Sequence, residues 1–280
     1  MMNPVASRGV RKSILAGSWY PGSASELGRT VDGLLAGVPD VALPGDLVGL
    51  IAPHAGYMYS GPVAAHAYKI LQGLSFDVVA VVSPIHRMYA GSVVVNDASH
   101  YETPLGLVEV DSRLVAALEE RVDLNRVEWD DEHSLEIQLP FLQRVLDGFR
   151  LLPIMQGDQS LSTSQKLADA LVDILQGGKA LLVASTDLSH FHSYTAAVQL
   201  DKVVLDLVSR YDPLGLSRAL KGGEAEACGG GPVITVMLAA RALGADRAQI
   251  LHYANSGDVT GDRSRVVGYL AAALFRTAAQ

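Results

Sequence analysis

The sequence predicts an α/β fold: a single-domain, three-layer αβα sandwich around a mainly parallel central sheet of mixed character. Short apolar runs rich in valine, leucine and isoleucine alternate with helix-like segments through most of the chain. Such alternation is typical of parallel strands that helices cover on both faces. No linker divides the sequence, so 1–280 are expected to form one domain, with 1–46 as an N-terminal arm and helix packed on it.

Composition narrows the classes of function. The 280 residues are 49% hydrophobic and 19% charged, which is enough apolar material for a large core and gives little sign of disorder. The formal net charge is -8 and no Lys/Arg-rich run occurs, so neither nucleic acid nor an anionic membrane is an expected partner.

Localisation is expected to be cytoplasmic. The N-terminal segment has basic residues but no apolar stretch after them, so no signal peptide is expected, and no apolar run reaches membrane-spanning length. The single cysteine, Cys228, cannot form an internal disulfide, which favours a reducing compartment.

The first half of the chain is expected to open with an irregular arm over 1–22 that Trp19 pins down. A helix with Ser23 or Ser25 as its cap should follow. The remaining elements are expected in this order: strand 47–52, helix 61–72 with Pro62 in its first turn, strands 78–82, 93–95 and 107–110, and helix 113–121 with Ser112 as its cap.

The second half should start with a polar cluster at 130–136 that leads into a helix. Pro140 would free the carbonyl of Glu136, so a kink or a late helix start is expected there. Strand 151–155 is weakened by its proline. The remaining elements are expected in this order: helix 160–176, strand 180–184, helix 196–210, a glycine-rich loop over 222–231, helix 232–243, and strands 250–253 and 264–270.

Three of the predicted strands end in motifs that carry histidine: PH at 53–54, SPIH at 83–86 and STDLSH at 185–190. If these strands are parallel neighbours, their carboxyl ends bring four side chains to the sheet edge where α/β proteins bind ligands: His54, His86, Asp187 and His190. Such a cluster could hold a divalent transition metal or act as a general-base site without one, and both interpretations stay open.

Cys228 lies in a glycine loop at the start of a predicted helix. Backbone N–H groups and the helix dipole are expected to lower the pKa of the thiol and favour the thiolate. Three roles stay open for this residue: a metal ligand, a nucleophile with a neighbouring histidine as base, or a buried structural side chain.

The acidic segment 130–136 offers two spaced pairs. Glu132 with Glu136, and His133 with Glu136, would share one face of a helix. The same acidic residues could instead stabilise a helix N-terminus through the macrodipole. The motifs HEXXH, Walker A, GxSxG and a strand-linked GxGxxG are all absent, so nothing favours a zincin protease or a nucleotide site, and the CGGGP loop alone is a weak phosphate signal.

Six motifs match one known family in order and wording along nearly the whole chain: GSWYP at 17–21, APHAGYMYSGPVAAHAY at 52–68, SPIH at 83–86, DEHSLEIQLP at 131–140, STDLSH at 185–190 and CGGGP at 228–232. In these motifs the chain resembles the Memo family, whose bacterial and archaeal members are named as component B of the AmmeMemoRadiSam system. Memo proteins are similar in fold to LigB-type class III extradiol dioxygenases, which use non-haem Fe(II).

The resemblance implies a set of site residues. By matched motif, the metal ligands of the family fall on His54, His86 and Cys228. The acid and the histidine of its pocket fall on Asp187 and His190, with His190 as acid/base by analogy with the dioxygenases and Asp187 orienting it. Further residues are expected to bind substrate: Tyr57, Tyr59, Arg87, Glu132, His133 and His192.

Two departures from related patterns affect the expected chemistry. The dioxygenases use two histidines and a carboxylate, whereas the third ligand here would be a thiolate, which favours copper or zinc more than a carboxylate does. The expected cofactor is a divalent transition metal: iron or copper first, and zinc as an alternative. Arg87 stands where some Memo members carry a second histidine, and would leave a cation at the mouth of the pocket.

These residues support competing functions. The first is a metal-dependent redox or dioxygenase-like enzyme acting on a small molecule that is aromatic or anionic. The second is a non-catalytic ligand- or peptide-binding adaptor, since animal Memo resembles a signalling protein said to recognise phosphotyrosine peptides. A third is partnership with radical-SAM and AMMECR-like proteins, and a minor fourth is a zinc hydrolase. The sequence indicates neither the metal nor the substrate.

Overall fold

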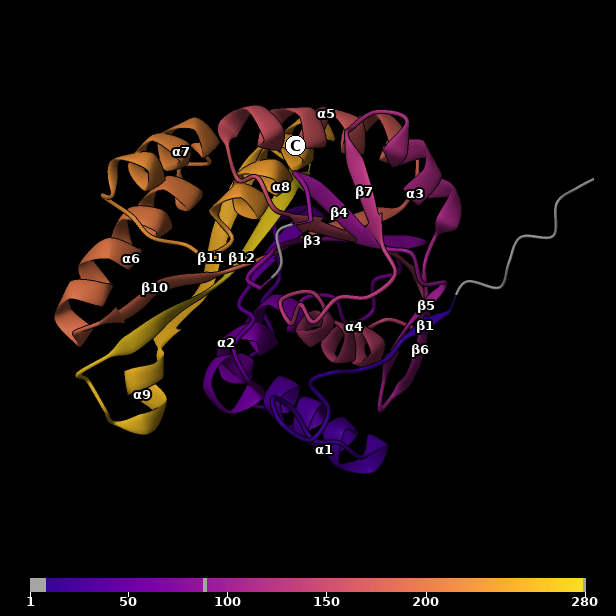
Figure 1. Ribbon diagram of the computed structural model, residues 1–280. Helices are drawn as coiled ribbons and strands as arrows, with labels where there is room; N and C mark the ends of the chain where they lie inside the picture. Colours follow the sequence, from indigo (N-terminus) through magenta and orange to yellow (C-terminus); the bar gives the residue numbers. More distant parts are fainter. Residues whose placement is uncertain (1–8, 88–89, 279–280) are drawn as a thin grey trace, which may run out of the picture.

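A mixed sheet crosses the molecule from one side to the other (Figure 1). The computed structural model describes residues 9–87 and 90–278. In that part of the chain the strands follow one another in the order β10 (Asp187–His192), β12 (Val266–Thr277), β2 (Gly45–Ala52), β9 (Ala180–Ser185), β3 (Val78–Pro84), β8 (Arg150–Gln156), β4 (Val93–Asn96) and β7 (Leu124–Val127), and β11 (Arg247–Asn255) also pairs with β12. The four strands β2, β9, β3 and β8 are parallel, while β10, β11 and β12 are antiparallel.

Helices cover both faces of this sheet, which confirms the predicted αβα sandwich (Figure 1). One layer holds α1 (Ala24–Ala36), α2 (Tyr57–Lys69) and α4 (Leu139–Val145). The other holds α3 (Ser112–Glu119), α5 (Leu161–Leu175), α8 (Gly230–Ala242), α6 (Tyr194–Ser209) and α7 (Pro213–Gly222). A short helix, α9 (Ser256–Thr260), joins β11 to β12.

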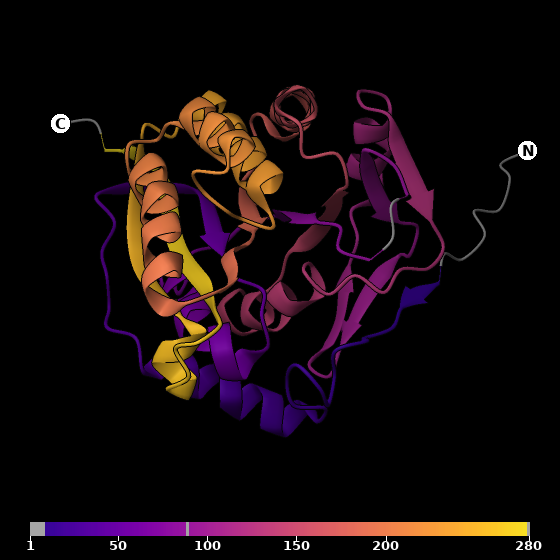
Figure 2. The ribbon, with the colours of Figure 1, turned by 60° about the vertical axis from the view of Figure 1, so that its left-hand side comes forward.

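The expected N-terminal arm begins outside the described residues, over 1–8, and continues as β1 (Val10–Arg11). This strand pairs with β5 (His100–Thr103), which pairs in turn with β6 (Gly106–Glu109). Figure 2 shows this small sheet on the opposite side of the molecule from β11 and β12. Further along, α1 packs on α2 and α4, so the first part of the chain is bound to the sandwich along one side.

Apolar side chains decide which strands are central. Every residue of β3 is buried, and β9 is buried from Leu181 onward. Such continuous burial is typical of parallel strands with helices on both faces. The proline of β8 is tolerated because, among the described residues, β4 pairs with β8 at Met155 and Gln156 but not at Pro153, whose strand partner is Val81 of β3.

The structure differs from the prediction at two places, near the first histidine motif and near the third. Helix α2 begins at Tyr57 rather than at 61, so Pro62 lies inside the helix and leaves the carbonyl of Met58 without its helical donor. Met58 itself is 68% exposed. No helix or strand was predicted between 184 and 196, but 187–192 form strand β10 on β12, with register shifts on both sides of His190.

The segment 130–136 is not the start of a helix, which corrects the expected pairing of Glu132 with Glu136 on one helix face. A 3₁₀ helix, η1 (Glu136–Gln138), comes first, and α4 follows with Pro140 in its first turn. The late start expected from the proline is therefore confirmed. A second correction concerns α3, which is capped by Asp111 rather than by Ser112, because the Asp111 carboxylate accepts the N–H groups of the first turn.

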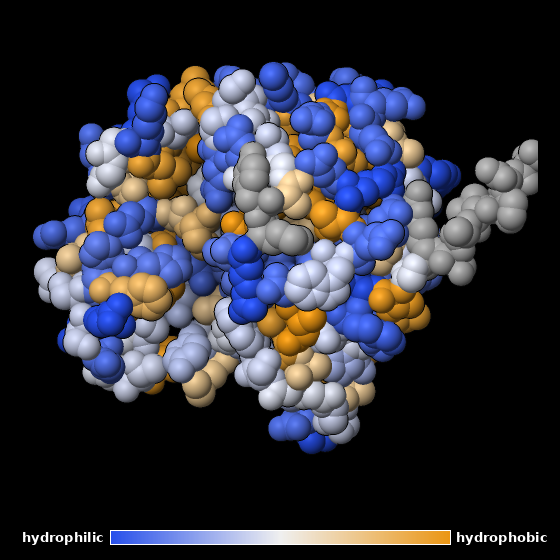
Figure 3. Space-filling view, viewed as in Figure 1, coloured by the Kyte–Doolittle hydropathy of each residue, from blue (hydrophilic) through white to orange (hydrophobic). Residues whose placement is uncertain are grey.

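The surface is mixed in character. On the face seen in Figure 3, hydrophobic residues form several separate small areas among hydrophilic ones. The most exposed large apolar side chains are Met58, Trp129 and Phe191. Among the described residues, no helix combines the length and apolarity needed to cross a membrane.

A buried ionic network ties the N-terminal arm to the segment before α4. The carboxylate of Glu136, 1% exposed, accepts hydrogen bonds from Arg11 Nη1 at 2.6 Å and from Tyr20 Oη at 2.6 Å. It also accepts from Ser13 and from the backbone N–H groups of Ile14 and Leu15. The same arginine donates to both oxygens of Asp130. Removing one partner of such a network leaves the others buried without compensation.

We predict that Arg11→Met lowers the free energy of unfolding by about 3 kcal/mol, because Asp130 and Glu136 would stay buried without their cation. The matched control is Arg144→Met, which breaks an exposed ion pair with Asp32 and should cost less than about 1 kcal/mol. Urea unfolding of both variants measures the difference. Equal losses for the two variants would contradict the assigned role of Arg11.

Candidate metal centre

The three histidine-bearing motifs converge, as the sequence analysis predicted. Strand β9 lies between β2 and β3, all three are parallel, and Ala52 pairs with Ser185 across the β2–β9 ladder. His54 follows β2 and His86 follows β3 at the same edge. One ligand atom from each of His54, His86 and Cys228 lies within 4.8 Å of the others, which makes the three residues a candidate metal-ligand group.

The hydrogen bonds around His54 determine its tautomer. Ser185 Oγ donates its proton to the Ser134 carbonyl at 2.6 Å and accepts a hydrogen bond from Gln138. The 2.9 Å contact between His54 Nδ1 and Ser185 Oγ therefore requires the proton on Nδ1. The lone pair of His54 Nε2 is then directed at Cys228 Sγ, 3.1 Å away. Burial, followed by the charges of His86 and His133, lowers the pKa of His54, so its ring is neutral at pH 7.

His86 is oriented by Glu132 in the same way. Its Nδ1 lies 3.0 Å from Glu132 Oε1, and its backbone N–H donates to Glu132 Oε2 at 2.6 Å. Burial acts to raise the pKa of Glu132, but hydrogen bonds from His86 and from the backbone of Ser134 outweigh it and hold the pKa well below its usual value. An ionised carboxylate can only accept, so Nδ1 carries the proton and Nε2 of His86 is left as a possible ligand.

The environment of Cys228 corrects the expected thiolate. The residue precedes Gly229, the N-cap of α8, and its sulfur accepts the backbone N–H of Asp187 at 3.2 Å. Burial nevertheless dominates, and together with the charge of Asp187 it raises the pKa of the thiol well above its usual value. At pH 7 the thiol without metal is therefore protonated.

The glycines after Cys228 are explained by close packing. A Cβ atom at Gly229 would overlap the carbonyl oxygen of Ser185 and lie 2.8 Å from Thr186 Cβ. A Cβ atom at Gly231 would lie 2.7 Å from Gln159 Cβ. Only residues without side chains let the start of α8 approach the end of β9 closely enough to bring Cys228 to His54.

Asp187 and His190 occupy separate places in β10. The Asp187 carboxylate accepts the backbone N–H of His54 at 2.7 Å, and burial raises its pKa to about 7 although that hydrogen bond lowers it. The expected orientation of His190 by Asp187 is not what the structure shows, because Asp187 is turned toward His54. The carboxylate near His190 is Glu226, and burial lowers the pKa of the His190 imidazole.

His133 lies next to His86 and Glu132. Its ring stacks on His86 with centroids 4.5 Å apart and also lies 4.5 Å from the ring of Trp19. Burial, opposed by the charge of Glu132, lowers the pKa of His133 to about 4. His86, Glu132 and His133 form a second candidate metal-ligand group that shares His86 with the first.

Four other residues were expected to bind substrate, and they lie in different surroundings. Tyr57 is buried, donates its hydroxyl to the Ile137 carbonyl and packs on Phe141. Tyr59 is 36% exposed in the first turn of α2. Arg87 Nη1 lies 3.5 Å from Asp131 Oδ2, a long ion pair. His192 Nε2 lies 2.9 Å from both carboxylate oxygens of Glu226.

A hollow of about 380 Å³ opens beside Cys228. Its lining includes His190, Glu226 and Gln159 together with apolar side chains such as Leu188 and Leu220. Gln159 donates to the Cys228 carbonyl at 2.7 Å and accepts the N–H of Gly231, so this amide holds the cysteine loop in place. A small molecule in the hollow would contact both Cys228 and His190.

Several important residues were not singled out from the sequence. Ser185, Ser134 and Gln138 orient His54, and Glu226 faces His190 and His192. The available signal was a polar side chain beside apolar ones, since Gln138 lies between Ile137 and Leu139 and Ser185 ends the apolar run of β9. No such signal distinguishes Glu226.

We predict that Gly229→Ala lowers the free energy of unfolding by about 2 kcal/mol, because the added methyl group overlaps the backbone of Ser185. Gly222→Ala, at the end of α7, is the matched control: its nearest atom would lie 3.6 Å away, and stability should hardly change. Urea unfolding and the rate of thiol modification at Cys228 would be measured. An unchanged rate in Gly229→Ala would mean that the packing does not position Cys228.

Comparison with known proteins shows the family of this chain. A family model described as Memo-like protein matches residues 11–273. A MEMO1 family protein of Methanopyrus kandleri is 35% identical, over 95% of this chain and 99% of its own length. Relatives in Methanothermobacter thermautotrophicus and Methanosarcina mazei are 36% and 37% identical, over 93% and 94% of this chain and 98% of their own lengths. The chain therefore belongs to the Memo family.

Proposed function

We propose that the protein is a metal-dependent redox enzyme, and that His54, His86 and Cys228 hold a divalent transition metal, iron or copper before zinc. The observation that carries the proposal is the pair of imidazoles whose Nδ1 atoms are both committed to acceptors, Ser185 and Glu132. That arrangement leaves both Nε2 atoms for a common ion, with the sulfur of Cys228 beside them. Support of ligating histidines by hydrogen-bond acceptors of this kind is usual in metal sites.

The donor set fits a borderline or soft transition metal. Two neutral imidazoles and one sulfur favour copper, zinc or iron over magnesium or calcium, which prefer oxygen ligands. A bound metal of this kind would supply Lewis acidity and, if iron or copper, one-electron chemistry. The exposed side of His86 and the hollow beside Cys228 leave room for a further ligand.

The protein's own residues would bind the substrate and move its proton. A small molecule in the hollow would lie against Leu188 and Leu220, which exclude water from part of it. His190, a neutral imidazole at pH 7 because burial lowers its pKa, would accept a proton from a substrate hydroxyl. Glu226, held by His192, would stabilise the imidazolium that results.

A second function is ligand binding without turnover on the same scaffold. The observation that favours it is the contact of His133 with two other rings, stacked on His86 and tilted against Trp19, an aromatic arrangement suited to recognition as well as to chemistry. Binding without oxygen consumption or product formation would distinguish this function from the first.

We predict that metal binding releases about one proton at pH 7.5, because the thiol of Cys228, with its raised pKa, must lose its proton, whereas the buried His54 is already neutral. The apparent affinity should rise about tenfold per pH unit from pH 6.5 to 8. Calorimetric titration with Zn²⁺ in buffers of different ionisation enthalpy measures the proton. Cys228→Ser should bind more weakly, and proton release that persists in this variant would exclude Cys228 as the source.

We predict that His190→Gln lowers turnover of the iron- or copper-loaded protein by about 100-fold without loss of bound metal. The measurements are oxygen uptake with simple phenols and catechols, and metal content by elemental analysis. His100→Gln, on the distant strand β5, is the control and should leave turnover unchanged. Bound substrate without oxygen uptake for either metal would favour the non-catalytic function instead.

A further inference from the structure

A second and larger hollow lies at the other end of the sheet, where β2 and β9 begin and β12 ends. Its volume is about 1070 Å³, at the upper end of the range typical of small-molecule sites. It lies between the loop before β2, the loop between α2 and β3, the loop between α5 and β9, and the end of α8. The proposed metal centre is at the opposite, carboxyl edge of the same strands, so the two sites are separate.

The lining of this hollow is mostly apolar and incompletely packed. Leu43, Leu47, Phe76 and Leu243 contact the hydrophobic core but are only partly buried. Leu74 at the rim is 43% exposed. Five glycines in the lining have no side chains to fill the space. An apolar body placed here would therefore bury surface that the protein alone leaves open to water.

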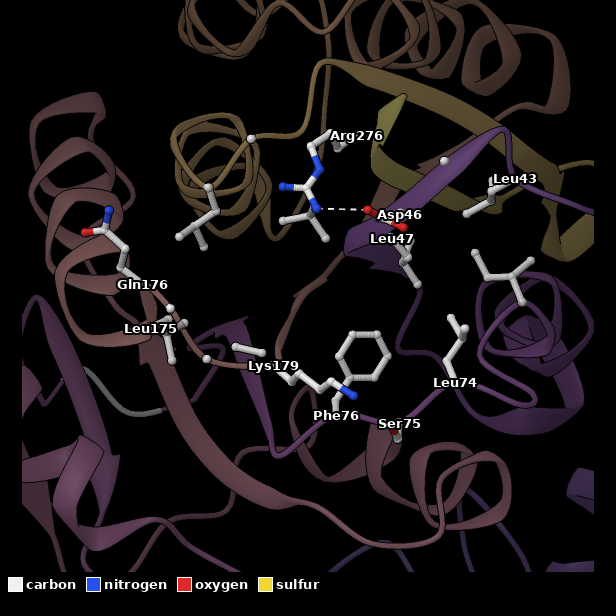
Figure 4. Close-up of a pocket in the computed structure, with 18 of the residues that line it drawn as sticks. Leu43, Asp46, Leu47, Leu74, Ser75, Phe76, Leu175, Gln176, Lys179 and Arg276 are labelled. Atoms are coloured by element: carbon white, nitrogen blue, oxygen red, sulfur yellow. Dashed lines mark hydrogen bonds and ion pairs between the residues drawn. The ribbon is translucent and has the colours of Figure 1, made fainter. Parts of the chain in front are cut away.

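The charged groups of the lining are predominantly cationic. They are Lys179, Arg276 and Asp46, a local excess of one positive charge in a chain whose formal net charge is -8. Arg276 Nη2 donates to Asp46 at 2.8 Å, whereas Lys179 has no ion-pair partner among the described residues. In Figure 4, Lys179 extends beside Phe76, and Arg276 lies on the other side of the hollow.

Both cations are anchored at their backbones. The carbonyl of Lys179 accepts the backbone N–H of Asp77 at 2.8 Å, just before β9 begins. Arg276 pairs with Asp46 in the ladder between β12 and β2. The guanidinium has five N–H donors, so it can bind a second anion without releasing Asp46.

We propose that this hollow binds a small amphipathic carboxylate, a soluble molecule with one anionic group on an apolar chain. The chain would lie against Leu47, Phe76 and Leu243. The carboxylate would pair with Lys179, which has no ion-pair partner among the described residues. Apolar burial supplies most of the affinity, and the unpaired charge of Lys179 selects an anion over a neutral or cationic molecule of the same shape.

The test is an NMR titration of the isotope-labelled, metal-free protein with decanoate and with decan-1-ol, both below the concentration at which decanoate forms micelles. We expect shifts of the amides of Leu47, Phe76 and Leu243, and binding of decanoate at least about fivefold tighter than that of decan-1-ol. Lys179→Met, which keeps the apolar stem, should remove this preference and leave the affinity for decan-1-ol unchanged.

Two further variants serve as controls. Lys166→Met, on an exposed part of α5 outside the hollow, should leave both affinities as they are. Cys228→Ser should also have no effect, which separates this site from the metal centre. The proposal is overturned if decanoate shifts no amide around the hollow, if both probes bind equally to the unmodified protein, or if Lys179→Met retains the preference.

Discussion

Parallel hydrogen bonding of β2, β9 and β3 is the interaction on which the site depends. The register places Ala52 beside Ser185 and Val82 beside Ala184, so the three strands reach the same edge of the sheet nearly level with one another. The chain leaves the sheet at each end through a motif with polar side chains. Because these side chains are buried, each must find a hydrogen-bond partner, and the partners come from the neighbouring motifs. Ser185, on the middle strand, therefore becomes the group that orients His54.

Two glutamates in the segment between β7 and α4 have different partners, one in the N-terminal arm and one at the candidate metal centre. Glu136 binds the N-terminal arm through Arg11 and Tyr20, whereas Glu132 turns the other way and orients His86. The arm in turn lays Trp19 against His133. Stability and site geometry are thus coupled through one short segment that is not α-helical. An α-helix would direct both glutamates toward one face, whereas here they contact different partners.

Cys228 illustrates a competition between two electrostatic effects. The start of α8 and the N–H of Asp187 favour a negative sulfur, but removal from water and the nearby carboxylate disfavour it more strongly. A thiol that stays protonated without metal and loses its proton only when a cation binds is suited to the proposed metal site. The same burial keeps His54 neutral, so its lone pair is available without competition from a proton.

From the sequence alone, the sandwich architecture and the meeting of His54 and His86 at one sheet edge could be predicted, because apolar runs define buried strands and motifs at their ends share an edge. The approach of Cys228, which precedes a helix, was implied only by the resemblance to the Memo family. The sequence also indicated the late start of α4, since proline cannot continue a hydrogen-bonded turn. Only the tertiary structure decided that Tyr57 enters the core, that 187–192 form a strand, that Asp187 turns toward His54 and that the Cys228 thiol stays protonated. These outcomes depend on burial and on partners far away in the chain, and local sequence patterns encode neither.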